Sequence, residues 1–546
     1  MRGLMMDAPL LITTILRHAE RNHPDQEIVS VTSDHERHRY RYREFADRAR
    51  QVANALDQLG AGSEARIATI AWNDFRHLEL YYGVSGSGRV LHTINPRLFE
   101  EQLVYIINHA EDEWIFVDPA FIAMLEKVED QCPTVKGYVV MTSAEAMPQT
   151  SLKNVQCYET LVSAQSTQYN WPELDERTAS CLCYTSGTTG NPKGVLYDHR
   201  SSVLHAYGMA LPDTTSLSAT DAVLAVVPMF HVNAWGFPYA SLLVGAKMVF
   251  PGPKLSVPET LTDLINDEQV TVAGAVPTVW LGLLDYIRKT GRSLEPLNRT
   301  CIGGSACPVS MMEEFRDEHG VTVLHAWGMT EMSPLGVLNR PKPAQIGLAG
   351  EELREQIAKQ GRAVPGVEIK ITDDDNNELP WDGEAYGALK VRGYWVCADY
   401  YRLDGTAGSH EDGWFETGDV ATIDPHGFLK ITDRTKDVIK SGGEWISSIE
   451  LENIAVAHPQ VQEAAVVGHI HTKWQERPLL VVVPNPGEQP DQGELLSWFD
   501  GKVAKWWIPN GVVFVEEIPH TATGKISKLT LRNQLEDYRF PDDDAA

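Results

Sequence analysis

Short apolar runs alternate with amphipathic helical patterns through much of this sequence, and that alternation restricts the fold more than any other feature. Residues 222–227 and 270–275 are runs rich in small and β-branched residues, which are typical of buried strands. Residues 258–266 and 278–288 carry apolar side chains at helical spacing. Strands that alternate with helices pair in parallel and are covered by those helices. The pattern therefore predicts an α/β fold with parallel-type sheets.

The character of the sequence changes near residue 366. Residues 366–431 are rich in Gly and Asp and contain short β-prone runs, which predict a small antiparallel β unit. A charged junction follows at residues 433–437, and the segment after it has helix and strand patterns of its own. A chain of 546 residues is too long for one core. We therefore expect a large N-terminal domain, residues 1–433, that includes the β unit, and a smaller, mobile α+β C-terminal domain, residues 434–546.

The net charge is strongly negative, because 75 Asp and Glu residues against 47 Lys and Arg residues leave −28. A surface of that sign repels nucleic-acid phosphates and anionic lipid heads, so we expect no nucleic-acid partner. The seven cysteines form no CxxC pair, and neither a zinc site nor a disulfide framework is expected. No apolar run is long enough to span a membrane, and the first residues lack a signal-peptide pattern. These features predict a cytoplasmic protein without integral membrane association.

A loop rich in glycines and hydroxyl groups follows the predicted strand 180–184. Residues 185–194 read TSGTTGNPKG. Glycines let the backbone turn its N–H groups toward an anion, hydroxyls add donors, and Lys193 adds positive charge. Pro192 before Lys193 distinguishes the loop from the common P-loop, which has Gly at that place. The loop predicts a phosphate-binding site.

Further motifs follow the loop in a fixed order, and together they identify a family. They are GGSACP at 303–308, WGMTE at 327–331, GWFETGD at 413–419, DRTKD at 433–437 and PHTATGK at 519–525. With the phosphate loop, this series resembles the adenylate-forming superfamily, which includes acyl-CoA synthetases, peptide-synthetase adenylation domains and luciferases. The sequence is therefore identified as a member of that superfamily.

The resemblance places the ATP and AMP site on these motifs. Asp419 is expected to accept hydrogen bonds from the ribose hydroxyls, and Arg434 to donate to the same sugar. Thr185 and Glu331 are expected to hold Mg²⁺, which prefers carboxylate and phosphate oxygens. The nucleotide-binding set that the resemblance implies is Thr185, Ser186, Gly187, Thr188, Thr189, Gly190, Lys193, Gly303, Gly304, Ser305, His325, Ala326, Trp327, Gly328, Met329, Thr330, Asp419 and Arg434.

The reaction of the superfamily joins a carboxylate to the α-phosphorus of ATP and expels diphosphate. A carboxylic acid with a pKa of about 4 is already ionised at neutral pH, so this step needs no general base. It needs positive charge, because two anions must meet and a third must leave. By resemblance, Lys525 is the central catalytic cation, and Lys436 and Arg434 complete the catalytic set.

The second step of acyl-CoA synthetases passes the acyl group to the thiol of CoA. In the superfamily the C-terminal domain rotates between the two steps, and the pivot of the motif falls on Lys436. Paired glycines after it suit a movable loop beside the pantetheine arm. The CoA-binding set is Lys440, Ser441, Gly442, Gly443, Glu444 and Trp445.

Residues 228–236, PMFHVNAWG, resemble the acyl-site segment of fatty-acyl-CoA synthetases. Trp235 takes the position of a tryptophan that gates the fatty-acid tunnel in that group. The acyl-binding set implied is His231, Trp235, Gly303, Trp327 and Pro334. Its bulky, mostly apolar members favour short or medium chains. The pattern is most similar to medium-chain fatty-acyl-CoA ligases and to 3-methylmercaptopropionyl-CoA ligases of marine bacteria, which the motifs do not separate.

The predicted function is an acyl-CoA ligase. It would convert ATP, CoA and a short- or medium-chain fatty acid or 3-methylmercaptopropionate into acyl-CoA, AMP and diphosphate through an acyl-adenylate, with Mg²⁺ as cofactor. The alternatives are an adenylating enzyme that loads a carrier protein or oxidises the acyl-adenylate, a long-chain ligase, a catalytically silent nucleotide-binding protein and a phosphotransferase. A homodimer is expected from the fatty-acyl-CoA synthetase resemblance alone.

Overall fold

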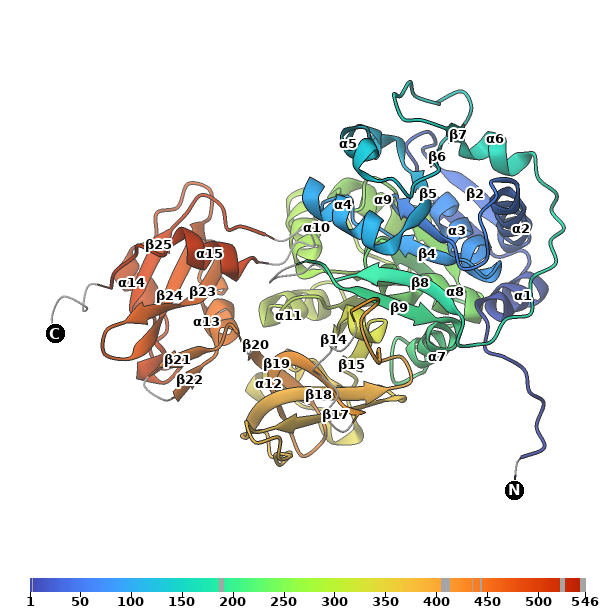
Figure 1. Ribbon diagram of the computed structural model, residues 1–546. Coiled ribbons are helices and arrows are strands. Elements are labelled where there is room, and N and C mark those ends of the chain that lie inside the picture. Colours follow the sequence, from blue (N-terminus) through green and yellow to red (C-terminus); the bar gives the residue numbers. More distant parts are fainter. Residues whose placement is uncertain are drawn as a thin grey trace.

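The structure is a computed structural model of the chain (Figure 1). It describes residues 1, 3–185, 191–403, 413–434, 436–441, 444–520 and 526–540, with the backbone alone at 444 and 445. The fold is α/β, with two large, mostly parallel sheets, a small antiparallel sheet and a smaller C-terminal unit. This architecture confirms the predicted fold class.

The first large sheet has the strand order β16-β15-β14-β13-β12-β10-β11-β1-β2. Its neighbours from β14 to β1 pair in parallel, whereas the outer pairs are antiparallel. The strands are β1 Glu27–Ser30, β2 His38–Arg41, β10 Ala222–Ala225, β11 Lys247–Phe250, β12 Val272–Ala275, β13 Arg299–Ile302, β14 Thr322–Gly328, β15 Leu335–Leu338 and β16 Arg362–Ala363.

The second large sheet has the order β7-β6-β5-β3-β4-β8-β9, and its neighbours pair in parallel except for β8 and β9. The predicted phosphate loop lies in the chain between the antiparallel strands β8 and β9. The strands are β3 Arg66–Ile70, β4 Val90–Thr93, β5 Asp112–Val117, β6 Gly137–Val140, β7 Val155–Cys157, β8 Ala179–Tyr184 and β9 Gly194–Asp198.

Helices lie between the two large sheets and on their outer faces, because each strand alternates apolar side chains to both sides. The largest apolar cluster joins both sheets to α1 (Ile12–Asn22), α2 (Tyr42–Gln58), α3 (Phe75–Gly86), α7 (His199–Ala210) and α8 (Phe237–Val244). α3 is buried along its whole length. The outer faces are covered by α9 (Pro258–Asp267), α10 (Pro277–Thr290) and α11 (Val309–Asp317) on the first sheet and by α4 (Glu100–Ala110) and α5 (Ile122–Val128) on the second.

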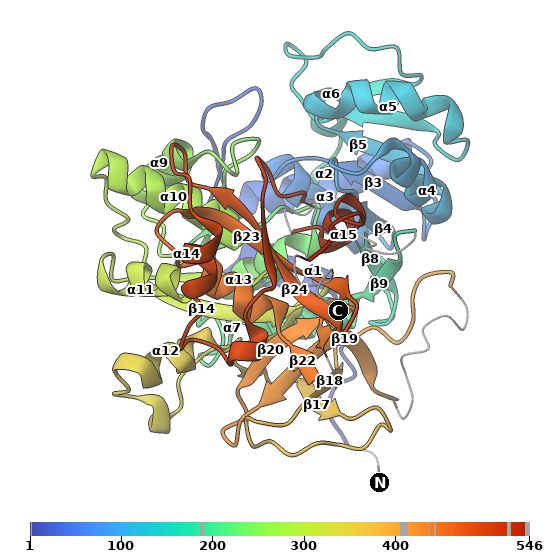
Figure 2. The same cartoon turned by 90° about the vertical axis from the view of Figure 1, so that its left-hand side faces the viewer.

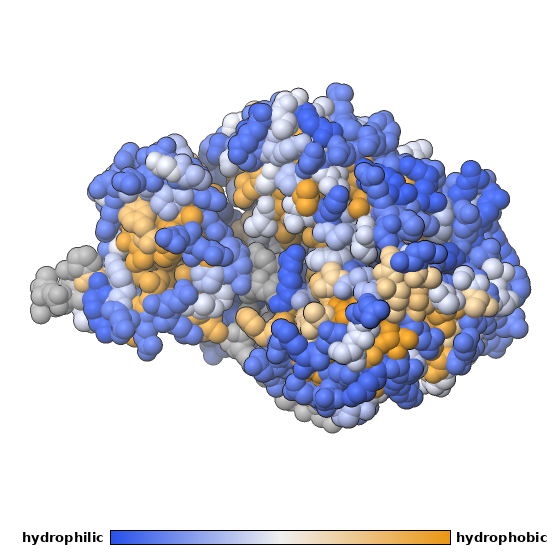
Figure 3. Space-filling model, turned by 90° about the horizontal axis from the view of Figure 1, so that it is seen from above, coloured by the Kyte–Doolittle hydropathy of each residue, from blue (hydrophilic) through white to orange (hydrophobic). Residues whose placement is uncertain are grey.

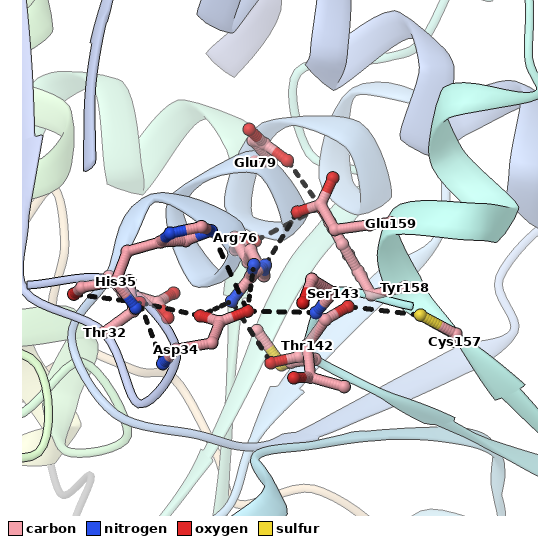
Figure 4. A network of polar contacts seen from close by, with 12 residues as sticks. Thr32, Asp34, His35, Arg76, Glu79, Thr142, Ser143, Cys157, Tyr158 and Glu159 are labelled. Atoms are coloured by element: carbon pink, nitrogen blue, oxygen red, sulfur yellow. Dashed lines mark hydrogen bonds and ion pairs between the residues drawn. The ribbon is translucent and has the colours of Figure 1, made fainter. Parts of the chain in front are cut away.

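A buried ionic network fixes α3 against the loop after β1 and against α6 (Tyr158–Ser163) (Figure 4). The Arg76 guanidinium, 1% exposed, lies 2.9 Å from the Asp34 carboxylate and 2.7 Å from that of Glu159. Burial alone would raise the pKa of Asp34, but its bonds to Arg76 hold that pKa well below its usual range. A buried guanidinium with two carboxylate partners makes this region sensitive to loss of either partner.

The small sheet is antiparallel, as predicted, with the order β17-β18-β19-β20. Its strands are Val367–Thr372, Tyr386–Gly393, Phe415–Ile423 and Leu429–Arg434, and α12 (Gly350–Ala358) precedes them. The predicted domain boundary at 433/434 falls on the last two residues of β20. That boundary stays a prediction.

The C-terminal unit follows β20 and lies beside the main body in Figure 1 and in front of it in Figure 2. Its elements are β21 Ile439–Ser441, β22 Glu444–Ile446, α13 Ser448–Val456, β23 Val461–His471, β24 Gln475–Pro484, α14 Gln492–Ser497, β25 Gly511–Phe514 and α15 Lys528–Gln534. The face seen in Figure 3 is mostly hydrophilic, with an apolar patch on this unit. Among the described residues, no helix combines the length and apolar character needed to cross a bilayer.

Candidate active site

A cavity of about 260 Å³ lies where the sequence motifs converge. Its walls come from the main body and from β19 and β20 of the small sheet. The residues that line it and were predicted from the sequence are Thr185, Lys193, His231, Trp235, Gly303, Gly304, Ala326, Trp327, Gly328, Met329, Thr330, Glu331, Pro334 and Arg434. The cavity therefore combines cationic, hydroxyl, carboxylate and apolar groups.

The predicted ribose ligands lie together at the end of β20. Asp419 on β19 is the register partner of Arg434 on β20, and the Arg434 Nε lies 3.1 Å from Asp419 Oδ1. Trp327 Nε1 donates to the other carboxylate oxygen at 2.8 Å. Asp419 is 4% exposed, and its two partners face the cavity. This arrangement orients a carboxylate whose remaining lone pairs can accept further hydrogen bonds.

Glu331, the predicted magnesium ligand, is held by Tyr400. The Tyr400 hydroxyl donates to Glu331 Oε1 at 2.7 Å, and the Lys193 ammonium lies 4.6 Å from the centre of the Tyr400 ring. Burial and the Glu331 carboxylate raise the pKa of Tyr400, so the hydroxyl stays protonated. Glu331 and Thr185 both line the cavity. Their oxygens fit a hard cation such as Mg²⁺.

The base of the phosphate loop is closed by Thr185 and Lys193. Thr185 N donates to the Lys193 carbonyl at 2.8 Å, and Lys193 N donates to Thr185 Oγ1 at 3.2 Å. The predicted loop residues between them, Ser186, Gly187, Thr188, Thr189 and Gly190, lie outside the described residues. The two bonds place a hydroxyl and an ammonium at the mouth of the same loop.

The apolar wall is built on a left-handed turn. Residues 232–236, which precede α8, all have positive φ, from 47° at Val232 to 82° at Gly236. A Cβ at Gly303 or Gly304 would lie 3.6 Å from the Trp235 ring, so this ring covers the two glycines. A Cβ at Gly303 would also meet the Ala326 carbonyl at 2.9 Å, which only glycine avoids.

Some predicted residues do not line the cavity. Ser305 is exposed, and His325 is buried behind the wall, where burial lowers its pKa to about 4. Lys436, Lys440 and Ser441 lie in the C-terminal unit, where the buried Ser441 accepts a bond from Arg477 at 3.0 Å. Lys525, Gly442 and Gly443 lie outside the described residues, and the side chains of Glu444 and Trp445 are likewise not described. The roles given to these residues stay predictions.

Several lining residues were missed by the sequence reasoning: Asn191, Met209, Thr215, Val232, Cys301, Leu335, Tyr400 and Thr417. Asn191, Cys301 and Thr417 lie within or beside recognised motifs, so the motifs themselves could have indicated them. Met209, Thr215 and Tyr400 lie in segments without a motif, and only tertiary packing brings them to the cavity.

The fold and this cavity define an adenylate-forming enzyme. Residues 16–401 match the AMP-binding enzyme family, and residues 450–525 match the AMP-binding enzyme C-terminal domain. The chain therefore belongs to the AMP-binding enzyme family.

Relatives match the chain over almost its whole length. It is 53% identical to a 3-methylmercaptopropionyl-CoA ligase of Ruegeria pomeroyi, over 98% of this chain and 99% of that protein. It is 50% identical to a medium-chain-fatty-acid–CoA ligase of Ectopseudomonas oleovorans, over 98% of both. The solved structure of the anthranilate CoA ligase AuaEII with anthranoyl-AMP superposes with a TM-score of 0.86 at 24% identity, covering 97% of this chain and 98% of that one. The last comparison shows the fold alone.

Proposed function

We propose that this protein is an acyl-CoA ligase that activates a short- or medium-chain carboxylic acid, 3-methylmercaptopropionate among them, with ATP and transfers the acyl group to CoA. One observation carries the proposal: a single cavity joins a phosphate-loop cation, a carboxylate suited to Mg²⁺ and an apolar wall. The two curated relatives, named for these acids, support the substrate class.

In the first step, a carboxylate oxygen of the substrate bonds to the α-phosphorus of ATP, and the bond to the diphosphate oxygen breaks. Lys193 and Arg434 bring positive charge to the cavity, and Asp419 orients the sugar. Lys525, three positions before the first residue of α15, supplies the central cation between the two anions. Glu331 and Thr185 would hold Mg²⁺, which would supply positive charge to the phosphate oxygens.

In the second step, the thiol of CoA loses its proton, the sulfur bonds to the acyl carbon, and AMP leaves. Residues 440–445 form the CoA-contacting hairpin of the proposal, and Lys436 is its pivot. The mobile C-terminal domain, residues 434–546, belongs to the same proposal. The proposal also includes a cytoplasmic location and a homodimer. Sedimentation analysis tests the homodimer.

The test is an acid panel with purified protein, ATP, Mg²⁺ and CoA. We expect AMP release matched by loss of free thiol, with best rates for medium-chain acids or 3-methylmercaptopropionate. Best rates with long chains would favour the long-chain alternative. Diphosphate exchange without thiol loss would indicate an enzyme that loads another acceptor, and ADP as product would indicate a phosphotransferase. A Lys525→Ala variant should bind ATP but form almost no AMP.

A further inference from the structure

Helix α15 lies against the junction that joins the C-terminal unit to β20. The helix begins at Lys528, three positions after Lys525. Lys528 and Arg532 are four residues apart, so both project from one face of the helix. Arg532 bonds to one end of the junction 433–437, and Lys528 reaches the other end through Ser448.

Lys528 holds the first end through a buried polar cluster. Its ammonium lies 2.8 Å from Glu452 and 2.5 Å from Ser448 Oγ, both on α13. Asp433, 1% exposed, accepts from the backbone N–H and the hydroxyl of Ser448, each at 2.6 Å. Burial alone would lower the pKa of Lys528, but the carboxylates of Glu452 and Asp433 outweigh burial and raise it. The ammonium therefore stays charged.

Arg532 holds the second end. Its guanidinium forms an ion pair with Asp437, and Nη2 donates to the Lys436 carbonyl at 3.2 Å. The side chains of Arg532 and Asp437 are 28% and 12% exposed, so solvent screens this pair only in part. One helix thus clamps the junction at both ends.

The junction also leads directly to the cavity. Asp433 and Arg434 are consecutive residues of β20, and consecutive strand residues point to opposite sides. Asp433 turns toward α13 and its cluster, whereas Arg434 bonds to Asp419 and lines the cavity. The same two residues therefore connect the clamp to the nucleotide end of the site.

We infer that Lys528 and Arg532 are positioning residues that fix Lys525, three positions before α15, relative to Arg434 and the cavity by clamping the junction with α15. This inference rests on the proposed function, since it requires Lys525 to act at the cavity. The predicted ATP contacts of the main body lie outside the clamp, and Arg434 keeps its ion pair with Asp419 without it. Loss of the clamp should therefore lower the rate of adenylation rather than ATP affinity.

The experiment uses the full chain with Arg532→Gln, Asp437→Asn and the double variant. We expect kcat for ATP–diphosphate exchange to fall about 10-fold in each single variant, with KM for ATP within about twofold, because small misplacements of a catalytic group are costly. The double variant should be no slower than the singles. Arg532→Lys should recover part of the rate. Arg539→Gln is the matched control, since Arg539 bonds only to the nearby carbonyls of Glu536 and Tyr538 among the contacts of the described chain.

Hydrogen exchange gives a second readout that does not depend on activity. Amides of residues 436–441 should exchange faster in Arg532→Gln, while those of α14, which holds none of the clamp's bonding partners, stay unchanged. Wild-type exchange rates at the junction, additive effects in the double variant, or a loss carried by KM for ATP would each overturn the inference. If wild-type protein catalyses no diphosphate exchange, the proposed function fails instead, and hydrogen exchange still tests the clamp.

Discussion

Tyr400 is the side chain that links the phosphate loop to the predicted magnesium ligand. It donates to Glu331 and lies under the Lys193 ammonium. Tyr400→Phe should raise the Mg²⁺ concentration needed for half-maximal activity and lower kcat/KM for ATP about 10-fold, because a hydrogen bond to a charged group contributes about 1.5–3 kcal/mol. Titrating Mg²⁺ in the diphosphate-exchange assay measures both effects. Tyr401→Phe is the neighbouring control, and equal loss in both variants would argue against a specific role for Tyr400.

His205 adds a pH-dependent term to stability. It is 2% exposed, accepts from the Leu335 N–H at 3.2 Å, and burial lowers its pKa from 6.5 to about 3. Below pH 6.5 the unfolded chain therefore binds a proton that the folded chain does not, so acid removes stability. When the pH falls from about 7 to about 5.5, the His205→Gln variant should lose about 1 kcal/mol less unfolding free energy than the wild-type protein.

Urea unfolding of both proteins at the two pH values measures that difference. His426→Gln, an exposed residue, is the control and should reproduce the wild-type change. A His205→Gln variant that loses as much stability on acidification as wild type would contradict the assignment of a neutral, buried imidazole.

Residues within motifs were the part of the site that sequence could predict. The ordered motifs predicted Glu331 and Arg434, which line the cavity, and Asp419, which bonds to Arg434 behind that lining. Tyr400 and Met209 could not be found in this way, because an isolated Tyr or Met has no local signature of a binding site. Their positions depend on how distant segments pack.

The conformation of the turn at residues 232–236 could not be predicted from the sequence. Non-glycine residues in the left-handed region cost about 1–2 kcal/mol each, so local propensity predicts another conformation. Asn233 Oδ1 accepts from Tyr81 and Cys181, both at 3.3 Å, and these bonds hold the turn. By contrast, α9 and α10 follow their apolar periodicity, and the sequence predicted their bounds to within two residues.

Gly303 tests the packing between this turn and β14. Gly303→Ala would place a methyl group against the Ala326 carbonyl and beside the Trp235 ring, so it should narrow the cavity. We expect kcat/KM for the acid to fall at least about 10-fold, while the unfolding free energy changes by about 1–3 kcal/mol. Gly62→Ala, where a Cβ would meet nothing within 4 Å, is the control. Unchanged acid kinetics in Gly303→Ala would place the acyl group elsewhere.

The whole molecule carries a charge of −28, which opposes the approach of anionic ATP. Cations inside the cavity act on ATP over a few ångströms, whereas the negative surface charge acts over longer distances. Salt screens the longer-range repulsion first, because the Debye length is about 8 Å in physiological salt. Raising KCl from about 20 mM to about 150 mM should therefore increase kcat/KM for ATP. Rates measured at fixed Mg²⁺ check this, and a steady decrease with salt would mean that the local cations dominate.

The cavity draws its lining from residues as far apart as Thr185 and Arg434, on both large sheets and on the small one. No single segment contains enough of the wall to recognise a nucleotide. A nascent chain that ends before β19 and β20 lacks Thr417 and Arg434, and its binding site is therefore incomplete. Nucleotide binding therefore requires a completed fold, in which the last strand of the small sheet has docked.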